Sequence, residues 1–292
     1  MKKMIFAGVL GALLSCIAAT GAPLNIVALN LEWFPGQDTQ STPDAMAAHK
    51  AHARDALEVL APDLLIATEI CEPDALREAI SGIEGLQLHV VSDFKDAEAD
   101  PTRRNQQIAI ASKLPAVAGW SEAWQPTMEG LRRGFTFAAL LNPATKKLIL
   151  VYGLHLKSNK SDTPQEAEQN YAIRDASVRQ LIDHMRKMEE QFSSQGIEGW
   201  IIGGDINTNH DGEYRDHVVE MITAEGFVNT WSTVPKEERR TWKGRVDRFA
   251  PSTLDYIFVK GFGEPAAKLY IVPQKVSDHN AVILNIALPQ SP

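Results

Sequence analysis

The amino-acid sequence predicts a mixed α+β fold in which two β-sheets pack against each other and helices lie outside them. Segments with the apolar or alternating patterns of strands outnumber the segments with a helical period. Two of the strand segments, residues 134–141 and 147–156, are neighbours joined by an Asn-Pro-Ala-Thr turn, as in a hairpin. Helical patterns separate other strands, so the chain combines both kinds of connection.

The first half of the chain contributes three predicted strands and one helix. Residues 25–31 are apolar and alternating, which is typical of a strand. Residues 42–60 begin with Thr-Pro, typical of a helix N-terminus with a threonine cap and proline at the first helical position. Residues 62–69 predict a short buried strand. The polar residues 93–107 predict an exposed loop before a further strand at 107–111.

The second half continues the mixture after the hairpin. Residues 165–192 have the longest helical pattern, with apolar side chains recurring along one side. The apolar residues 200–202 predict a buried strand, and a helix is expected around residues 214–225. Residues 252–259 predict a strand with Asp255 at its centre, and residues 281–288 predict the last strand.

The beginning of the chain is predicted to be a secretory signal peptide. A Met-Lys-Lys start precedes the apolar residues 4–14 and then small residues, and this apolar stretch is too short to span a membrane. We therefore assign residues 1–22 to the signal. Residues 23–292 are expected to form one domain, because no repeat, low-complexity tract or long linker divides them.

Two ways of processing this signal are open. Ala19-Thr20-Gly21 is a small-x-small cleavage site, whereas Leu13-Leu14-Ser15-Cys16 resembles a lipobox that would place a lipid on Cys16. The plain signal is favoured, because leucine is unusual at the position of Leu14 in a lipobox. Either route predicts a periplasmic or extracellular protein.

Charge and cysteine content exclude several classes of protein. The formal net charge of −8 becomes −10 when Lys2 and Lys3 leave with the signal, since no acid leaves with them. Such an acidic chain is not a general nucleic-acid coat, so any polyanion must be met by a local basic patch or a metal ion. Cys71 would then be the one remaining cysteine, without an intramolecular disulfide, and is expected to be a small buried residue.

The chemistry is expected to centre on residues 203–209, which follow the apolar strand at 200–202. The two glycines allow a sharp turn, and Asp205 and Asn207 are two residues apart. In an extended backbone they would point the same way. A carboxylate and an amide so placed suit a hard metal ion, a phosphoryl oxygen or an activated water. An Asp/Asn-rich turn after a core strand is the alternative explanation.

Polar side chains recur at the ends of the other predicted strands. Oxygen ligands from several strands suit Mg²⁺, Mn²⁺ or Ca²⁺ better than zinc, and two histidines near carboxylates suit phosphate binding and proton transfer. Together they predict metal-assisted hydrolysis of a phosphoester. A histidine pair at 49 and 52 is instead expected on a solvated helix face, since no third ligand is indicated. The strand-end residues are Asn30, Glu32, Glu69, His155, Asp205, Asn207, Asp255, Asp278 and His279.

On these residues the chain resembles the endonuclease/exonuclease/phosphatase superfamily, which has the deoxyribonuclease I-like fold. The motifs occur in the family's order over nearly the whole mature chain, with Thr68 where the family usually has Gln and Ile206 where it has an aromatic residue. The resemblance implies a four-layer α/β/β/α sandwich of two packed mixed sheets flanked by helices. The matching motifs are Asn30-Leu31-Glu32, residues 62–69, His155-Leu156-Lys157-Ser158, Gly204-Asp205-Ile206-Asn207, Leu254-Asp255-Tyr256-Ile257 and Ser277-Asp278-His279.

The resemblance also implies a metal site. Glu69 would hold the ion, and Asn30, Glu32 and Asp278 would contact it directly or through water. The expected ion is Mg²⁺ or Mn²⁺, with Ca²⁺ as a further possibility.

Catalytic roles follow from the same resemblance. Asp205 would orient or deprotonate the attacking water, and Asn207 would position this water or a phosphoryl oxygen. His279, oriented by Asp255, would act at the scissile phosphate as an imidazolium or a base. The transition-state charge would be stabilised by His155 and Arg133, with the adjacent Arg132 as the alternative for the arginine.

The superfamily includes nucleases, inositol-phosphate phosphatases, sphingomyelinases and other phosphodiesterases, so the fold does not settle the substrate. A nuclease acting on DNA or RNA is favoured by the basic and aromatic residues 239–248, by Arg103-Arg104 and by residues 157–160, although these could be solvated loop charges. A phosphatase or lipid phosphodiesterase, of the inositol phosphate or sphingomyelin type, is the alternative. A sphingomyelinase would need an exposed apolar hairpin, for which residues 120–128 are the nearest candidate.

A non-enzymatic binding protein would need a lost catalytic residue, and none of the motif positions is lost. The expected partner is therefore a phosphoester substrate, in the first place a nucleic acid. No stable protein partner is implied, and we expect a monomer.

Overall fold

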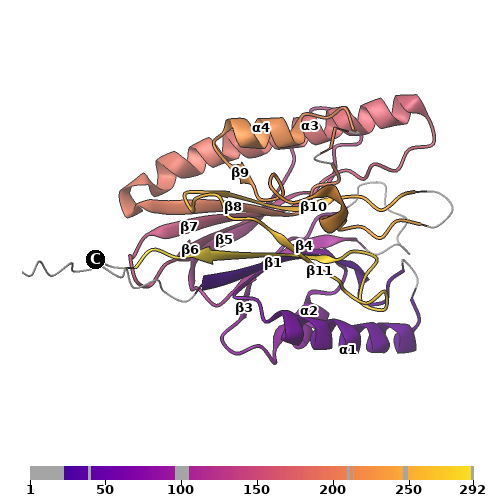
Figure 1. Ribbon diagram of the computed structural model, residues 1–292, viewed down its shortest axis with the longest axis horizontal. Helices are drawn as coiled ribbons and strands as arrows, with labels where there is room; N and C mark the ends of the chain where they lie inside the picture. Colours follow the sequence, from indigo (N-terminus) through magenta and orange to yellow (C-terminus); the bar gives the residue numbers. More distant parts are fainter. Residues whose placement is uncertain are drawn as a thin grey trace, which may run out of the picture.

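The computed structural model describes residues 23–38, 41–95, 105–208, 211–212, 214–245 and 249–290. Two six-stranded mixed sheets pack face to face, and helices cover the outer face of each (Figure 1). This four-layer α/β/β/α arrangement confirms the predicted fold class. α1 (Pro43–Leu60) and α2 (Pro73–Ile80) lie below the first sheet, and α3 (Pro164–Phe192) and α4 (Val218–Ala224) lie above the second.

Each sheet is built mostly from antiparallel neighbours with one parallel pair, β1 with β2 in the first and β7 with β8 in the second. In spatial order, the first sheet contains β11 (Lys268–Tyr270), β12 (Ala281–Ala287), β1 (Pro23–Phe34), β2 (Leu64–Ile70), β4 (Gln107–Ser112) and β3 (Gln87–Val91). The second contains β5 (Ala116–Ala123), β6 (Gly134–Leu141), β7 (Leu148–His155), β8 (Ile197–Asp205), β10 (Asp255–Lys260) and β9 (Val228–Asn229).

The central strands are apolar on both faces, because both faces are buried. In β1, Ile26 and Ala28 belong to the core between the two sheets, whereas Val27 and Leu29 belong to the core beneath α1 and α2. A strand covered on both sides needs a continuous apolar sequence rather than apolar and polar residues in alternation. A polar side chain can therefore reach solvent only where such a strand ends.

Two glycines of the second sheet allow the sheets to approach closely beneath these strand ends. A Cβ at Gly203 of β8 would lie 2.8 Å from Cδ1 of Ile66 on β2. A Cβ at Gly153 of β7 would lie 2.5 Å from the Thr136 hydroxyl and 3.3 Å from Cγ2 of Ile66. Each glycine is two residues before a candidate site residue. The Ile66 side chain thus packs into the space that a side chain at position 153 or 203 would fill if either residue were larger than glycine.

Several elements differ from the sequence prediction. The helix expected around residues 214–225 is shorter, and the strand expected at 252–259 begins only at Asp255, because residues 242 and 252 pair in a separate β-bridge. The prediction did not include β3, β5, β11 or α2. Cys71 is half-buried rather than buried.

His49 also lies differently than expected. It is buried, not solvated: its Nδ1 accepts a hydrogen bond from the Gly36 amide at 2.7 Å, and its Nε2 lies 2.7 Å from the Val276 carbonyl. The ring therefore connects the loop after β1 to the loop before β12. The reason could not be read from helical spacing, because both partners are distant in sequence.

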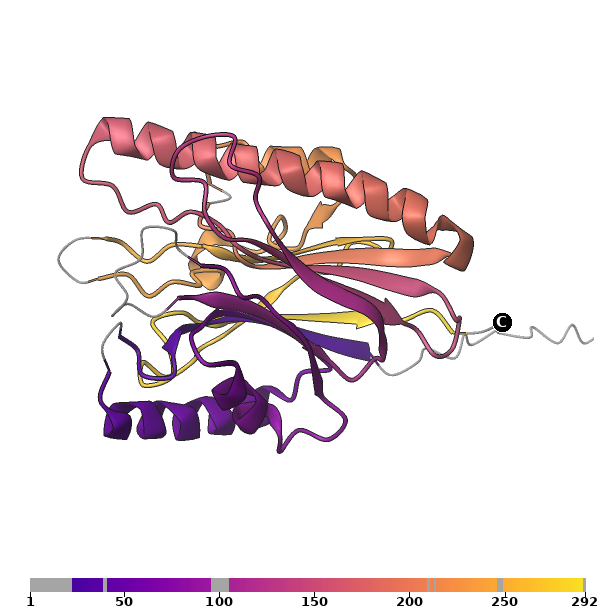
Figure 2. The ribbon, with the colours of Figure 1, turned by 180° about the vertical axis from the view of Figure 1, so that it is seen from behind.

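The predicted signal peptide and Cys16 lie outside the described residues. Among the helices that the structure describes, none combines the length and apolar character needed to cross a membrane. The loops that carry the candidate site lie at the end of the molecule opposite to the C-terminus (Figures 1 and 2).

Candidate active site at the strand ends

β1 and β2 both change register where their polar residues occur. The pairing of β1 with β2 is interrupted between Asn30 and Phe34, and the pairing of β2 with β4 skips Glu69. Glu32 and Glu69 have positive φ angles of 46° and 62°, which are rare for residues with a side chain. Such bulges re-aim side chains next to functional sites. Local strain, rather than the period of two, thus brings the two glutamates toward the site.

Asn30 connects the two sheets. Its Nδ2 donates to Oε1 of Glu69 and to Oδ2 of Asp205, both at 3.0 Å. Glu69 belongs to the first sheet and Asp205 to the second, so one buried amide holds two carboxylates from different layers in place. The second oxygen of Glu69 accepts from the Trp33 amide at 3.0 Å.

Glu32 and Asp278 form the outer part of the acidic cluster. Oε2 of Glu32 accepts from the Asp278 amide at 2.8 Å, and Oδ2 of Asp278 accepts from the indole of Trp242 at 3.0 Å. Ser277 donates to the Asn30 carbonyl at 2.7 Å and accepts from the His279 amide at 2.9 Å. The segment before β12 is thereby attached to the end of β1.

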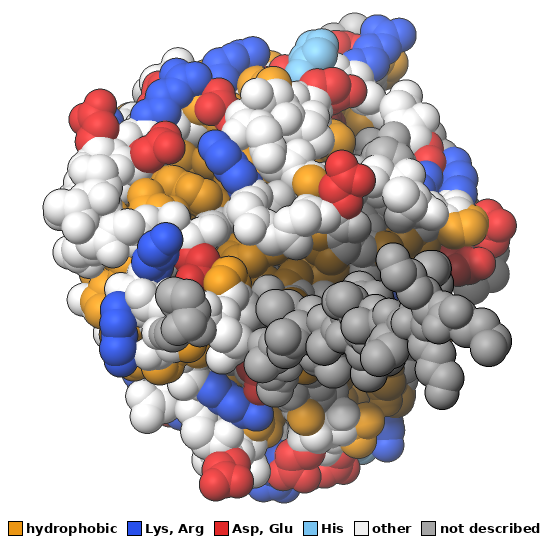
Figure 3. Space-filling model, turned by 60° about the vertical axis from the view of Figure 1, so that its left-hand side comes forward, with side chains coloured by type: hydrophobic (Ala, Val, Ile, Leu, Met, Phe, Trp, Pro, Cys, Tyr) orange, Lys and Arg blue, Asp and Glu red, His pale blue; other side chains and the backbone are white. Residues whose placement is uncertain are grey.

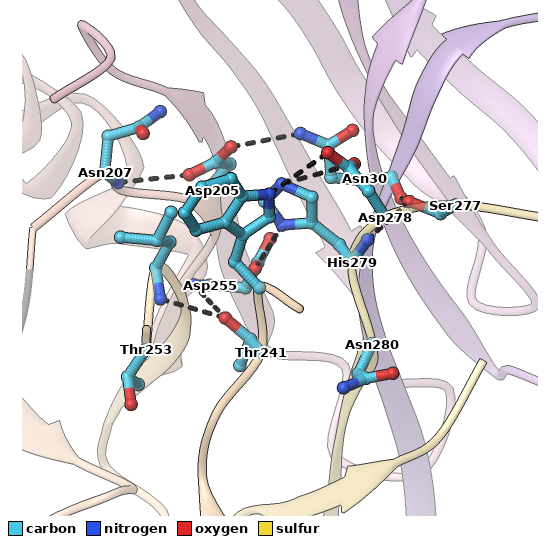
Figure 4. A network of polar contacts seen from close by, with 12 residues as sticks. Asn30, Asp205, Asn207, Thr241, Thr253, Asp255, Ser277, Asp278, His279 and Asn280 are labelled. Atoms are coloured by element: carbon cyan, nitrogen blue, oxygen red, sulfur yellow. Dashed lines mark hydrogen bonds and ion pairs between the residues drawn. The ribbon is translucent and has the colours of Figure 1, made fainter. Parts of the chain in front are cut away.

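His279 is paired with Asp255 beneath this cluster (Figure 4). The distance between His279 Nδ1 and Asp255 Oδ2 is 2.7 Å, and both side chains are buried. The Asp255 amide donates to the Thr241 hydroxyl at 3.0 Å, and its carbonyl accepts from the Trp231 indole at 2.9 Å. Hydrogen bonds to both its amide and its carbonyl therefore hold the backbone that carries the Asp255 carboxylate.

His155 ends β7 and faces the carboxylates of both sheets. Its Nε2 lies 3.8 Å from Oε1 of Glu69 and 3.7 Å from Oδ2 of Asp205. Arg133, with a φ of 64°, donates to the His155 carbonyl at 3.2 Å and to Gln106 Oε1 at 2.9 Å. The guanidinium is thus fixed against the backbone that carries His155.

Asn207 lies differently than the sequence suggested. β8 ends at Asp205, and Asn207 has a φ of 54°, so the two residues do not share one face of an extended strand. The Asn207 amide donates to Asp205 Oδ1 at 3.1 Å (Figure 4). The side-chain Nδ2 of Asn207 donates to the Leu156 carbonyl at 3.2 Å. A turn, not the strand period, brings Asn207 beside Asp205.

A buried arginine of α3 supports the two loops that follow β7 and β8. Arg174 is fully buried and donates to the Lys157 carbonyl at 3.0 Å and to Asp216 Oδ2 at 3.0 and 2.6 Å. The other oxygen of Asp216 accepts from the Thr208 hydroxyl. Sequence reasoning missed Arg174, because nothing in a helical pattern marks a buried cation whose partner is 42 residues away.

Burial and mutual repulsion shift the pKa values of the acids. Burial, followed by the charge of Asp278, raises the pKa of Glu32 to about 7. Burial, followed by the charge of Asp255, raises the pKa of Asp205 to about 7, and burial raises the pKa of Glu69. Each acid is therefore harder to ionise than in water, and a nearby cation would relieve this cost.

The two histidines are shifted in opposite directions. Burial alone would lower the pKa of His279, but the charge and hydrogen bond of Asp255 outweigh it and raise this pKa to about 10. Burial, followed by the positive charges of Arg133 and His279, lowers the pKa of His155. The site thus contains one imidazolium, His279, and one neutral imidazole ring, His155.

The donor set fits a divalent metal ion. Ligand atoms of Glu69, His155 and Asp205 lie within 4.8 Å of one another, and the negative charge of Asp278 contributes to the raised pKa values of Glu32 and Glu69. Oxygen-rich donors of this kind suit Mg²⁺, Mn²⁺ or Ca²⁺. Asp205, Asp255 and His279 form a second such group, but its histidine and Asp255 already satisfy each other.

The structure brings the predicted site residues together, with Arg133 and Asn207 at the margin of the cluster. The basic segment 239–248 is different. Arg239 is buried and ion-paired with Asp211, and Lys243 donates to the Val272 and Ser277 carbonyls. These two cations are engaged in internal contacts, and Trp242 donates to Asp278. The three residues therefore support the site and do not form a surface for nucleic acid. Arg103, Arg104 and Arg248 lie outside the described residues.

Comparisons with known proteins agree with this arrangement. The model of the endonuclease/exonuclease/phosphatase family matches residues 27–279. No curated protein matches the chain. Among solved structures, a family protein from Beutenbergia cavernae superposes with a TM-score of 0.65 at 17% identity, over 93% of this chain and 73% of that one. Truncated Caenorhabditis elegans TDP2 has a TM-score of 0.62 at 16% identity, over 91% and 98% of the two chains. At these identities the likeness shows the fold alone.

Proposed function

The chain belongs to the endonuclease/exonuclease/phosphatase family, and from this premise we propose that it is a metal-dependent phosphodiesterase that cleaves nucleic acid. The observation that carries the proposal is the convergence of Glu69 and Asp205, held by Asn30, with His155 and the His279–Asp255 pair. Two carboxylates, a neutral imidazole and an imidazolium in one buried cluster suit attack of water on a phosphoester.

Glu69, with Glu32, Asp278 and Asn30 around it, would hold the divalent ion. When bound, the ion supplies positive charge to the phosphoryl oxygens and lowers the pKa of water. Mg²⁺ or Mn²⁺ is our proposal, because the donors are mainly oxygen atoms.

The protein's own groups supply the rest of the chemistry. Asp205 orients the attacking water and accepts its proton, which its raised pKa favours. His279 is held protonated by Asp255 and donates to the phosphoryl group or the leaving oxygen. His155 contributes a hydrogen-bond donor and Arg133 contributes positive charge near the phosphoryl group. The Asn207 amide fixes the orientation of Asp205.

A lipid substrate is disfavoured by the position of the two tryptophans of residues 120–128. Trp124 is buried against Phe135, and Trp120 packs against Phe137 and His184. Trp124 belongs to the core and Trp120 is half-buried against it, so the two rings do not form an exposed apolar hairpin. A phosphatase acting on a small phosphoester remains the second candidate, since the same cluster would serve it.

We also propose that residues 1–22 direct the protein to the periplasm or the outside of the cell. The basis is the sequence pattern of these residues. Mass measurement of the mature N-terminus, which would also reveal a lipid on Cys16, tests this assignment.

Hydrolysis should depend on a divalent metal ion and on the residues of the cluster. Hydrolysis of bis-p-nitrophenyl phosphate should require Mg²⁺ or Mn²⁺ and cease in EDTA. Asp205→Ala and His279→Ala should each lower kcat at least about 10³-fold, because they remove the proton acceptor and the imidazolium. His52→Ala, on the remote helix α1, is the matched control and should retain full activity.

Two results would contradict the mechanism: activity that is indifferent to EDTA, or a His279→Ala protein as active as the wild type. The same assay with plasmid DNA, RNA, sphingomyelin and inositol phosphates then ranks the substrate classes. Turnover of inositol phosphates alone would favour the phosphatase.

A further inference from the structure

His49 of α1 contacts both of the loops that carry the outer acids of the candidate metal site. Its side chain is buried, with 2% of its surface exposed. Its Nδ1 accepts a hydrogen bond from the Gly36 amide at 2.7 Å, and its Nε2 lies 2.7 Å from the Val276 carbonyl. Gly36 follows Glu32 in the loop after β1, and Val276 precedes Asp278 in the loop before β12. The ring therefore connects the backbones that carry these two acids.

The two partners determine the form of the His49 ring. A backbone amide can only donate, so Nδ1 carries no proton. A backbone carbonyl can only accept, so Nε2 carries the proton and donates to Val276. The ring is thus a neutral imidazole whose acceptor and donor are both used between the two loops. A buried side chain with this geometry fixes the separation of two segments.

The loop after β1 needs support from its neighbours, because its backbone is strained. Glu32 and Gln37 have positive φ angles of 46° and 66°. Residues with a side chain adopt such angles only where surrounding contacts hold them. The ring of His49 lies edge-on to Phe34, with 5.1 Å between the ring centroids and 81° between the planes. This ring contact and the hydrogen bond to Gly36 hold the loop against α1.

Other hydrogen bonds join the same two loops through Glu32 itself. The Asp278 amide donates to Glu32 Oε2 at 2.8 Å. Nε2 of Gln37 donates to the same oxygen at 2.9 Å and to the Gln274 carbonyl at 2.8 Å. An ion that binds Glu32 would compete with the bonds to its carboxylate. The hydrogen bonds of His49 use backbone groups alone, so ion binding does not compete with them.

Mixed surface charge contributes little to the binding of a cation. On the face shown in Figure 3, Asp and Glu side chains lie interspersed with Lys and Arg side chains. Charges mixed in this way create little net attraction for an ion. The affinity of the site then depends on how well its ligands are placed before the ion arrives, because ligands already in position lose less conformational entropy on binding.

We propose that His49 is a positioning residue for the metal site, which sets the affinity for the divalent ion by fixing the separation of Glu32 and Asp278. It acts through the backbones of the two loops and touches neither the ion nor the substrate. This inference rests on the proposed function, since it concerns the ion that the phosphodiesterase would use. Loss of the ring weakens metal binding and leaves the chemistry of the fully loaded enzyme intact.

The test measures metal binding without turnover. Mn²⁺ is titrated into the metal-free protein, and electron paramagnetic resonance measures the free ion. His49→Leu removes both hydrogen bonds and should bind Mn²⁺ about tenfold more weakly than the wild type, as expected when a group that supports metal ligands is lost. His49→Gln retains one acceptor and one donor and should recover most of the affinity. His52→Leu makes the same substitution at a half-buried position of α1 and should leave the affinity unchanged.

Two further readouts separate positioning from general stability. Thermal unfolding in EDTA shows whether each variant is folded, and His49→Met, whose flexible side chain fills irregular space, replaces His49→Leu if the latter is not. Activity of the apolar variant on bis-p-nitrophenyl phosphate should fall about tenfold at Mn²⁺ concentrations well below Kd and return to the wild-type kcat at saturation, since only the affinity is changed.

A purely structural role would lower Tm in EDTA and leave the Mn²⁺ affinity of the folded protein unchanged. That result would overturn the proposal. It would also be wrong if His49→Gln bound Mn²⁺ no more tightly than the apolar variant, or if His52→Leu weakened binding as much as His49→Leu.

Failure of this inference and failure of the proposed enzyme are distinguishable. Equal Mn²⁺ binding by the wild type and His49→Leu would refute only the role of His49. Wild-type protein whose Mn²⁺ affinity depends on His49, but which hydrolyses no phosphodiester, would refute only the proposed activity. Wild-type protein that bound no Mn²⁺ would refute the metal site and this inference together.

Discussion

At the scale of single residues, the site depends on fixing one imidazole. His279 Nδ1 is 2.7 Å from Asp255, whose backbone is in turn held by Thr241 and Trp231. A carboxylate so placed fixes the ring orientation and stabilises its charged form. Burial by itself would lower the pKa of His279, and the charge and hydrogen bond of Asp255 are the largest influences that raise it.

Asp255→Asn should therefore lower kcat by about 10² to 10⁴-fold with little loss of folding. Because the carboxylate is what raises the pKa of His279 to about 10, the amide variant should lose its imidazolium at lower pH, and the alkaline limb of the kcat profile should shift to lower pH. The pH profile with bis-p-nitrophenyl phosphate measures both effects.

Asp175→Asn is the matched control, since Asp175 also contacts a histidine ring, His217 Nδ1 at 2.9 Å, but outside the site. It should leave kcat and the pH profile unchanged. An Asp255→Asn protein with an unshifted alkaline limb would disprove the positioning role.

The identities of the site residues could be predicted from sequence, but their geometry could not. Strand-terminal acids on apolar segments are conspicuous, because a buried carboxylate needs a partner. Glu32, Glu69 and Asn207, however, reach the site through positive φ angles and register shifts. Such local strain is stabilised by neighbours distant in sequence and leaves no periodic pattern.

At the scale of elements, α3 does more than cover the second sheet. Arg174 connects it to the Lys157 carbonyl after β7 and, through Asp216, to Thr208 after β8. The ring centroids of Tyr171 and Tyr214 lie 5.2 and 5.8 Å from Cζ of the Arg174 guanidinium. One side chain thus fixes both loops that follow β7 and β8, which carry proposed catalytic groups.

Arg174→Met should reduce the free energy of unfolding by about 3–5 kcal/mol, because it leaves Asp216 as a buried unpaired charge. Urea unfolding followed by tryptophan fluorescence measures this loss. Arg179→Met on the same helix removes an exposed arginine 3.8 Å from Asp175 and should change stability by less than about 0.5 kcal/mol. Equal losses in the two variants would show that the buried pair has no special role.

The long elements were predictable because they combine clear signals. α3 begins where a threonine and a proline mark a helix start, and its apolar residues recur with the helical period. β5 was missed because it is an edge strand with many half-exposed residues, and β3 and β11 are short edge strands whose neighbours, rather than their composition, determine them.

At the scale of the whole molecule, acids from both sheets converge on one end of an acidic protein. Glu32 and Asp205, whose unperturbed pKa values are 4.5 and 3.8, both have pKa values of about 7 in the folded state without metal. At these two carboxyl groups the folded state therefore binds more protons than the unfolded chain between about pH 4 and 7. These groups destabilise the fold as pH rises through that range, and the cost is complete above it.

Mg²⁺ should accordingly raise Tm more at pH 8.0 than at pH 5.5, since at the lower pH the ion must displace protons. We expect a rise of ~5 °C at the higher pH with saturating Mg²⁺, and less than half of it at pH 5.5. Comparing Tm with and without the ion at one pH removes contributions common to both samples, including that of His155. Differential scanning fluorimetry at matched ionic strength measures the difference. Equal rises at the two pH values would contradict the linkage.

The overall fold was predictable from the order of apolar segments together with the family motifs. Strands that are buried on both faces need continuous apolar sequences, and these are visible in the sequence. The internal role of the basic segment 239–248 was not predictable. A sequence shows where cations occur but not which of them are used internally, as Arg239 and Lys243 are.

Ile66 packs directly against Gly153 and Gly203, so a larger residue at either glycine would disturb the packing between the two sheets. The spacing between Glu69 and Asp205, which belong to different sheets, depends on the thickness of the hydrocarbon layer three residues beneath Glu69. A single added methyl group there would act as a spacer and separate the two halves of the site while leaving every catalytic residue present. Damage of this kind would be invisible in any list of active-site residues.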